Sequence, residues 1–311
     1  MGHLVTYRTV MTDSTRWERF EHRPGDIVIS TPPKSGTTWT QMLCALMVFD
    51  GPSFPDRLDA LSPWLDMRIR TEDEVFDIYR RQEHRRFIKT HTPLDGLPLR
   101  DDVHYVVVGR DPRDVLISWE HHNDNLQVDV VLRHRFEAVG ADDLHEFDPP
   151  PAPEPDPAVR FRNFVDAEWS PGTLVSLPNV LHHLRTGWDH RHDANVELFH
   201  YLDYQRDLVG EMGRLAVHCS FDLDRERLAE LAPEAGIERM RGRAHEVAPD
   251  ISKSEHWHDP ARFFRSGSAG EWAERTTTAD RVHYDERVAE LVPDDLAIWI
   301  HEGGRSAPAD P

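Results

Sequence analysis

Short apolar runs alternate along the chain with stripes of helical period. The runs with strand character, largely apolar and rich in β-branched residues, are residues 26–30, 86–90, 104–109 and 196–201. After the first run, apolar residues recur at i, i+3, i+4 and i+7 from Trp39 to Met47, which predicts a helix. The alternation predicts an α/β fold: a single domain, residues 1–311, with a mainly parallel central sheet flanked by helices.

Residues with capping preferences mark where the helices begin and end. Gly51-Pro52 follows the first helical stripe, as is typical of a helix C-terminus. Asp111-Pro112 follows the third apolar run and has the pattern of an N-cap and first helical residue. Residues 280–301 have a helical pattern that breaks near Pro293.

One stretch has no periodicity. Residues 148–157 are mostly proline and acidic residues, which predicts an extended polyproline loop or a disordered excursion. We place it in an insertion at about residues 133–160 of the single domain.

Composition narrows the class of protein. The chain of 311 residues carries a formal charge of −20, so its surface repels a phosphate backbone and nucleic acid is not an expected partner. No run approaches the roughly 20 apolar residues of a transmembrane helix. The first twenty residues lack the apolar segment of a secretory signal, and two cysteines make no disulfide framework. We therefore expect a cytoplasmic protein.

The loop after the first predicted strand has the residues of an anion site. Backbone N–H groups and the helix dipole converge where a strand enters a glycine-containing loop and a helix begins. The loop contributes the ammonium of Lys34, the flexible backbone of Gly36 and the hydroxyl groups of Ser35, Thr37 and Thr38. In the nucleotide P-loop, G-x-x-x-x-G-K-[ST], the lysine follows the glycine; here it precedes it, so the usual magnesium-holding pattern is broken. The sequence predicts a P-loop-like phosphate site without a metal.

Several strings resemble the cytosolic-type sulfotransferases, which use 3′-phosphoadenosine 5′-phosphosulfate (PAPS). Residues 31–39, TPPKSGTTW, resemble the phosphosulfate loop of that family, and residues 86–94, RFIKTHTPL, resemble the segment of its catalytic histidine. Residues 105–118 resemble its 3′-phosphate segment, and residues 263–272 its C-terminal nucleotide loop. The sequence of residues 84–97 is most similar to that of mycobacterial members of the family, including a glycolipid sulfotransferase.

The resemblance implies three catalytic residues. Lys34 and Lys89 would stabilise the sulfonate and the leaving oxygen, and His91 would be the general base. The residue chemistry agrees, because sulfuryl transfer, like phosphoryl transfer, needs fixed positive groups where charge develops. Imidazole titrates near neutral pH, and His91 follows a predicted strand, where α/β folds place ligands. Three of the 36 basic residues are lysines, and two of these fall in the motifs.

The resemblance also implies the residues that hold the nucleotide. Arg110, Ser118, Arg265 and Gly267 would bind the 3′-phosphate, and Ser266 stands where the family usually has lysine. Trp39 would stack on adenine and Tyr201 matches a nucleotide-site tyrosine. The full predicted nucleotide set is Lys34, Ser35, Gly36, Thr37, Thr38, Trp39, Arg110, Ser118, Tyr201, Arg265 and Gly267.

Other charged and polar features have no such support. We expect Arg113 on the surface, and the pairs Arg80-Arg81 and Arg85-Arg86 on a solvated helix face. The grouped histidines, also expected on the surface, are His121-His122, His182-His183, His190 with His192, and His256 with His258. None has zinc-site spacing with cysteine or carboxylate. Of these, His122 is the candidate for lining an acceptor pocket. Cys44 is expected in the core.

The sequence predicts an enzyme that moves a sulfuryl group from PAPS to a hydroxyl and releases adenosine 3′,5′-bisphosphate. A P-loop-type phosphotransferase using ATP and magnesium is one alternative, and a non-catalytic nucleotide-binding protein is another. Glycolipid, sterol, phenol and small alcohol all stay open as acceptors, with a lipid-like acceptor favoured by the mycobacterial resemblance. A homo-oligomer also stays open.

Overall fold

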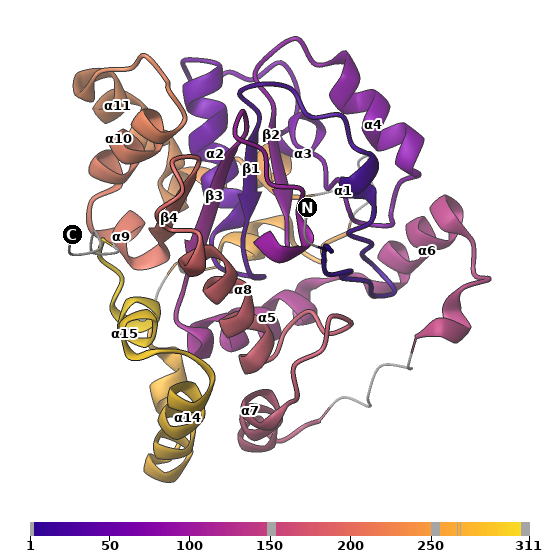
Figure 1. Ribbon diagram of the computed structural model, residues 1–311, viewed down its shortest axis with the longest axis vertical. Coiled ribbons are helices and arrows are strands. Elements are labelled where there is room, and N and C mark those ends of the chain that lie inside the picture. The colour runs from indigo at the N-terminus through magenta and orange to yellow at the C-terminus, as the bar shows by residue number, and fades with distance from the viewer. Residues whose placement is uncertain (1–2, 148–153, 250–255, 266, 268, 306–311) are drawn as a thin grey trace.

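A four-stranded parallel sheet forms the centre of the molecule (Figure 1). The computed structural model describes residues 3–147, 154–249, 256–265, 267 and 269–305. The strands are β1 (Ile27–Ser30), β2 (Phe87–Thr90), β3 (His104–Gly109) and β4 (Val196–His200), in the order β2-β1-β3-β4. The chain passes from β1 to β2 on one side and returns to β3 on the other, so a topological switch point lies at the carboxyl end of β1.

All four predicted strands are confirmed, with small shifts at their ends. Asp26 and Arg86 precede β1 and β2 rather than opening them, because their side chains form a buried ion pair, with Arg86 Nε 2.8 Å from Asp26 Oδ1. Tyr201 opens the helix after β4 instead of closing the strand. The prediction that Arg85 and Arg86 lie on a solvated helix face is wrong, since the helix of that region ends at Arg81.

Helices and 3-10 turns surround the sheet. The α-helices are α1 (Arg16–Arg19), α2 (Thr37–Val48), α3 (Leu58–Leu61), α4 (Glu72–Arg81), α5 (Pro112–Asn125), α6 (Val128–Val139), α7 (Pro157–Asp166), α8 (Leu177–Asp189), α9 (Tyr201–Arg206), α10 (Leu208–His218), α11 (Arg225–Leu231), α12 (Ile237–Gly242), α13 (Ala244–Val247), α14 (Thr278–Leu291) and α15 (Asp294–Glu302). The 3-10 turns are η1 (Leu94–Gly96), η2 (Leu144–Glu146), η3 (Ala232–Ala235), η4 (Pro260–Phe264) and η5 (Glu271–Glu274). In the part of the chain that the structure describes, no helix is long and apolar enough to span a membrane.

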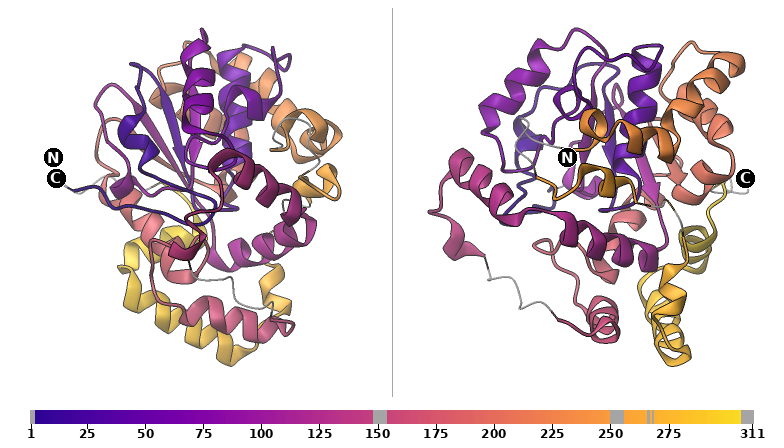
Figure 2. Two further views of the ribbon diagram at one scale, coloured as in Figure 1. Left: turned by 90° about the vertical axis from the view of Figure 1, so that its right-hand side faces the viewer. Right: turned by 180° about the vertical axis from the view of Figure 1, so that it is seen from behind.

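The sheet divides the hydrophobic core in two. Successive residues of β1 and β3 point to opposite faces, so Val28 and Val107 pack into one cluster while Ile29 and Val106 pack into the other. The first cluster is covered by α8, α14 and α15, and the second by α2, α10 and α11 (Figure 2). Cys44 is buried in the second cluster, as predicted. Both faces are therefore covered, as a parallel sheet requires.

The C-terminal helices return to the sheet. The predicted break near Pro293 is confirmed, because α14 ends at Leu291 and α15 begins at Asp294. His200 Nε2 at the end of β4 lies 3.0 Å from the carbonyl of Ile300, which ties α15 to the sheet.

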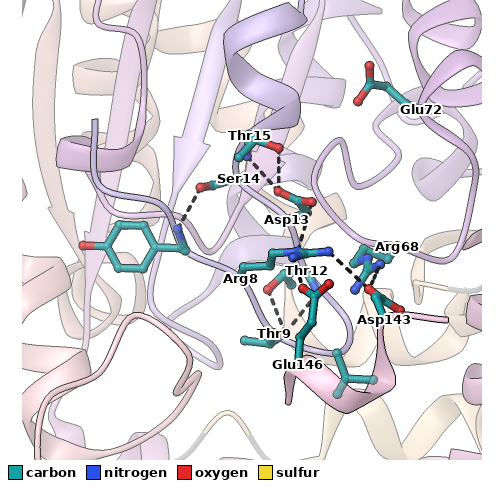
Figure 3. Close-up of polar contacts among 12 residues, drawn as sticks. Arg8, Thr9, Thr12, Asp13, Ser14, Thr15, Arg68, Glu72, Asp143 and Glu146 are labelled. Atoms are coloured by element: carbon teal, nitrogen blue, oxygen red, sulfur yellow. Dashed lines mark hydrogen bonds and ion pairs between the residues drawn. The ribbon is translucent and has the colours of Figure 1, made fainter. Parts of the chain in front are cut away.

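Part of the predicted insertion packs against the N-terminal segment. Asp143, between α6 and η2, accepts a hydrogen bond from Arg68, and Arg8 Nη2 lies 3.3 Å from it (Figure 3). It also accepts a hydrogen bond from Arg135 of α6. Partial burial opposes ionisation of Asp143, but the two arginines outweigh it and lower the pKa of the carboxyl to about 2. Asp143 therefore anchors the end of α6 to the body of the domain. The prolines at positions 149–151 and 153 lie outside the described residues, and the insertion itself stays a prediction.

Candidate active site

A cavity of about 650 Å³ opens at the carboxyl ends of the strands. Its walls include most of the residues that the sequence singled out: Lys34, Gly36, Thr37, Thr38, Trp39, Lys89, His91, Arg110, Ser118, Tyr201, Arg265 and Gly267. Ser35 is buried behind the wall. One of these residues follows the end of each strand: Lys34 after β1, His91 after β2, Arg110 after β3 and Tyr201 after β4. The parallel sheet therefore brings together side chains that are far apart in sequence.

The loop between β1 and α2 is shaped to bind an anion. Lys34 and Gly36 have φ values of 65° and 105°, both in the left-handed region, which turns the backbone sharply before α2 begins at Thr37. A side chain at Gly36 would be strained and would lie 3.2 Å from the ring of Tyr201. Ser35 Oγ is buried and has no hydrogen-bond partner among the described residues. A buried hydroxyl without a partner indicates a missing ligand or water, so the loop fits a phosphate group.

Lys89 is buried and Lys34 is partly buried on the cavity wall. Lys34 Nζ lies 3.2 Å from His122 Nδ1, and Lys89 Nζ lies 4.8 Å from the ring centre of Trp64. Burial lowers the pKa of both lysines to about 7, and the charge of Arg110 adds to the effect on Lys34. An anion bound between these lysines would therefore find cations that have lost most of their hydration.

His91 is held in one tautomer. Its Nδ1 lies 2.7 Å from the carbonyl of Thr31, which can only accept, so Nδ1 carries the hydrogen and Nε2 keeps its lone pair. The imidazole packs on Trp64, with 4.5 Å between ring centres. Burial, together with the charges of Lys34 and Lys89, lowers the pKa of His91 to about 4. The ring is therefore neutral at pH 7, with one nitrogen able to take a proton.

Arg110, Tyr201 and Trp39 form a connected wall beside the loop. Arg110 Nη1 donates to the carbonyl of Lys34 at 3.0 Å, and its guanidinium lies 4.3 Å from the ring centre of Tyr201. Tyr201 in turn meets Trp39 edge to face at 5.3 Å. Trp39 Nε1 is buried and has no partner within the described residues. The wall combines a cation with aromatic surface, as a nucleotide site does.

The other predicted nucleotide residues lie on the same side. Gly267 is close to Tyr201 and Ile237, and its carbonyl accepts a hydrogen bond from Gln205. Arg265 lines the cavity but forms an ion pair of 2.6 Å with Glu271, so a phosphate would have to share it with that carboxylate. Ser266 lies outside the described residues.

The far end of the cavity is apolar. Its lining there includes the small hydrophobic cluster of Met11, Met67, Ile69, Leu126 and Val131, together with Leu174. Val131 lies in the N-terminal half of α6, and Leu126 lies in the turn before this helix. The hydrogen bond from Arg135 to Asp143, which anchors α6, therefore also positions this wall. A ligand with an apolar portion fits this end.

Sequence reasoning missed several cavity residues. Trp64, Phe263 and Asp59 line the wall, and Asp59 lies close enough to Lys89 to influence its titration. Asp59 lies in the short helix α3 and Trp64 in the irregular segment after it, and Phe263 opens the string 263–272 but was given no role of its own. Trp64 could have been found because it lies in the segment SPWLD, residues 62–66, which also resembles the mycobacterial sulfotransferases.

Three predicted surface features are wrong. Arg113 is largely buried between its ion-pair partner Asp111 and the ring of Trp272, with the guanidinium 3.7 Å from the ring centre. Among the histidines, His183 is buried with Nε2 2.9 Å from Ser30 Oγ, and His256 is buried on the cavity wall. His122 lines the cavity, as its candidacy for an acceptor pocket required. Arg80 and Arg81 are exposed on α4, as predicted.

The donor set of the cavity suits an anionic organic ligand. It presents two lysines, three arginines and several hydroxyl groups, with aromatic rings beside them. Within the described ranges, no group of three or more histidine, cysteine, aspartate or glutamate residues could hold a metal ion.

Comparison with known proteins shows to which family the chain belongs. A family profile described as the sulfotransferase domain matches residues 24–294. The glycolipid sulfotransferase of Mycobacterium bovis is 44% identical, over 98% of this chain and 96% of the relative, and that of Mycobacterium tuberculosis is also 44% identical, with the same coverage. The crystal structure of a mouse sulfotransferase complexed with PAP superposes with a TM-score of 0.64 at 19% identity, over 90% of this chain and 88% of that one, which shows the shared fold. The chain therefore belongs to the sulfotransferase family and is a PAPS-dependent sulfotransferase.

Proposed function

We propose that this enzyme sulfates a hydroxyl of a lipid-like acceptor, with a glycolipid as the first candidate, and that His91, Lys34 and Lys89 carry the reaction. One observation carries the proposal. The neutral His91 and the two lysines lie in one cavity between a phosphate-type loop and an apolar wall. The glycolipid assignment is supported by the mycobacterial relatives, whose names state that substrate. A cytoplasmic location is part of the proposal.

His91 removes the proton of the acceptor hydroxyl. Its Nε2 is the nitrogen that can accept, because Nδ1–H is tied to Thr31. In the ligand-free protein, the charges of Lys34 and Lys89 add to the effect of burial on the low pKa of His91. An anionic donor offsets those charges and raises the pKa of His91 towards the range in which a general base is effective.

Lys34 and Lys89 stabilise negative charge at the reacting group. PAPS supplies an activated sulfuryl group, and charge builds on its leaving phosphate as that bond breaks. The loop amides and the hydroxyl groups of Ser35 and Thr37 hold the 5′-phosphate at the N-terminus of α2. Arg110, Ser118 and Arg265 hold the 3′-phosphate, which distinguishes PAPS from ADP-type nucleotides.

The test separates catalysis from binding. His91→Ala should lower kcat by roughly 10²–10⁴-fold with glycolipid acceptors, the usual contribution of a general base. Its affinity for adenosine 3′,5′-bisphosphate, measured by calorimetric titration, should stay close to that of the wild type. His192→Ala, an exposed histidine outside the cavity, is the matched control and should retain full activity. Full activity in His91→Ala would remove His91 from the mechanism.

The same titration tests the nucleotide assignment. The wild-type protein should bind adenosine 3′,5′-bisphosphate much more tightly than ADP, because ADP lacks the 3′-phosphate that Arg110 and Arg265 contact. Equal or tighter binding of ATP with magnesium would instead favour a phosphotransferase. Tight binding of the bisphosphate without transfer to any acceptor would favour a non-catalytic protein.

A further inference from the structure

The ammonium group of Lys34 is held on the acceptor side of the cavity. Lys34 Nζ lies 3.2 Å from His122 Nδ1 and 4.5 Å from the ring centre of Phe263. Its backbone carbonyl, by contrast, is fixed on the nucleotide side by Arg110. The residue thus spans the two halves of the site, and its charged end is held by a side chain to which the sulfotransferase activity assigns no role.

His122 has a well-defined position. It lies on α5 four residues after Ser118, so both side chains face the cavity from the same side of the helix. Its ring stacks on Trp119 with 5.2 Å between centres and 14° between planes, and it meets Trp257 edge to face at 5.0 Å. Packing on two indole rings fixes the direction in which Nδ1 points.

The charged groups around the contact between Lys34 and His122 determine which side chain donates the hydrogen bond. The titratable and charged groups that face the pair are Lys34 itself, His91 and Arg110. Burial, together with Lys34 and His91, lowers the pKa of His122 well below its usual value, so its ring is neutral. A charged Lys34 therefore donates and the Nδ1 lone pair of His122 accepts.

We propose that His122 is a positioning residue for Lys34: it accepts a hydrogen bond from the ammonium in the ligand-free enzyme, favours the charged form of that lysine, and releases it to the donor's phosphosulfate group. Phe263 and His122 both pack on Trp257, which pairs through its backbone with Leu126 of the apolar wall, so this contact holds the ammonium between the phosphate loop and the apolar end of the cavity. The inference rests on the proposed role of Lys34.

Two substitutions of His122 separate hydrogen bonding from packing. His122→Phe retains an aromatic ring for Trp119 and Trp257 but has no acceptor. His122→Asn loses the ring but places an amide oxygen near the position of Nδ1. With three lysines in the whole chain, Nζ and Cε resonances of isotope-labelled lysine resolve Lys34 directly, and Lys34→Arg and Lys89→Arg assign the signals.

The expected result is a change in the titration of Lys34. In the wild type, Lys34 should titrate near pH 7. In His122→Phe its pKa should fall by about one unit, because the charged form loses a hydrogen bond, and in His122→Asn it should return most of the way to the wild-type value. When the proteins are saturated with adenosine 3′,5′-bisphosphate, the pKa of Lys34 should be the same in the wild type, His122→Phe and His122→Asn.

Three outcomes would overturn the proposal. They are an unchanged Lys34 titration in His122→Phe, no recovery in His122→Asn, and a difference that persists in the bisphosphate complex. Kinetics give a second readout: the basic limb of the pH profile of kcat/KM for the donor should move to lower pH in His122→Phe alone. The lysine titration needs no turnover, so it reports on the His122–Lys34 pair even if the enzyme fails to sulfate every acceptor tried.

Discussion

Two of the three lysines, the buried Lys89 and the partly buried Lys34, lie on one cavity wall, whereas nearly all other positive charges of the chain are arginines. Arginine stays charged in any protein environment, but a buried lysine can lose its proton near neutral pH. Burial lowers the pKa of both Lys34 and Lys89 to about 7. At these two positions the charge therefore depends on what is bound, which an arginine could not provide.

Binding of adenosine 3′,5′-bisphosphate should be accompanied by proton uptake. The phosphates favour the charged lysines and raise their pKa, so protons are taken up at pH values above about 7, where the free lysines are partly neutral, and uptake disappears near pH 6. Calorimetric titrations at pH 8 in two buffers of different ionisation enthalpy measure the number of protons. Lys89→Met should take up fewer protons than the wild type. An enthalpy that is independent of buffer at pH 8 would contradict the assignment.

At the residue scale, the sequence predicted what lies in a local pattern and missed what depends on distant neighbours. The loop residues from Lys34 to Thr38 and His91 could be found because each follows an apolar run that becomes a strand. Arg113 was expected on the surface, yet it is buried by Trp272, which is far along the chain. His183 is buried for the same kind of reason, since its partner Ser30 belongs to β1. Hydrophobic periodicity carries no information about such pairs.

At the element scale, the strands were predictable because a fully buried strand leaves a continuous apolar run in the sequence. The ends of the strands were less predictable. The buried pair of Asp26 and Arg86 stands where β1 and β2 start, and only the folded structure shows that charged residues can be accommodated there by pairing. The irregular segments that complete the cavity, around α3 and η4, carry no periodicity and could not be predicted.

The attachment of α6 gives a prediction at this scale. Asp143 joins Arg135 of α6 to Arg68, and α6 supplies Val131 to the apolar wall of the cavity. Asp143→Asn should leave two largely buried guanidinium groups without a charged partner, loosen α6 and raise KM for a lipid acceptor several-fold. Affinity for adenosine 3′,5′-bisphosphate should be unchanged, because the residues proposed to bind the nucleotide lie on other elements.

Asp142→Asn is the control for Asp143→Asn. Asp142 is an exposed neighbour with the same side chain, so its substitution should leave KM for the acceptor unaltered. Steady-state kinetics with acceptor and donor varied separately make the comparison. An equal effect of both substitutions, or a loss of bisphosphate affinity in Asp143→Asn, would mean that Asp143 does not act through the acceptor wall.

For the whole molecule, net charge and local charge have opposite signs. The chain carries −20 overall, yet basic side chains outnumber acidic ones in the cavity lining: Lys34, Lys89, Arg70, Arg110 and Arg265 stand against Asp59, Asp114 and Glu271. The exclusion of nucleic acid as a partner rested on the overall charge, while the small anionic ligand is selected by the local one. A negative surface around a positive cavity favours anions small enough to enter it, which is a distinction that composition alone could not make.

Buried neutral histidines connect stability to pH across the molecule. His200, at the start of α9, accepts from the N–H of Leu202 through Nδ1 and contacts the carbonyl of Ile300 through Nε2, so its two partners require the neutral ring. Burial lowers the pKa of His200 to about 4 and that of His183 to about 3. Because the unfolded chain binds protons at about pH 6.5, the stability from these neutral rings is complete above that pH and is lost as the pH falls towards 4.

Acid should therefore destabilise the protein in a range where most carboxylates are still ionised. The free energy of unfolding from urea titrations should be nearly constant from pH 7.5 to about pH 6.5, and below that should fall by up to about 1.4 kcal/mol per pH unit for each histidine that stays neutral in the folded state. His200→Asn keeps an acceptor for the Leu202 N–H but cannot titrate, so its stability should depend less on pH than that of the wild type. His245→Gln, at an exposed site, should reproduce the wild-type slope. If the free energy of unfolding falls equally with pH in His200→Asn and in the wild type, protonation of His200 does not cause the loss of stability in acid.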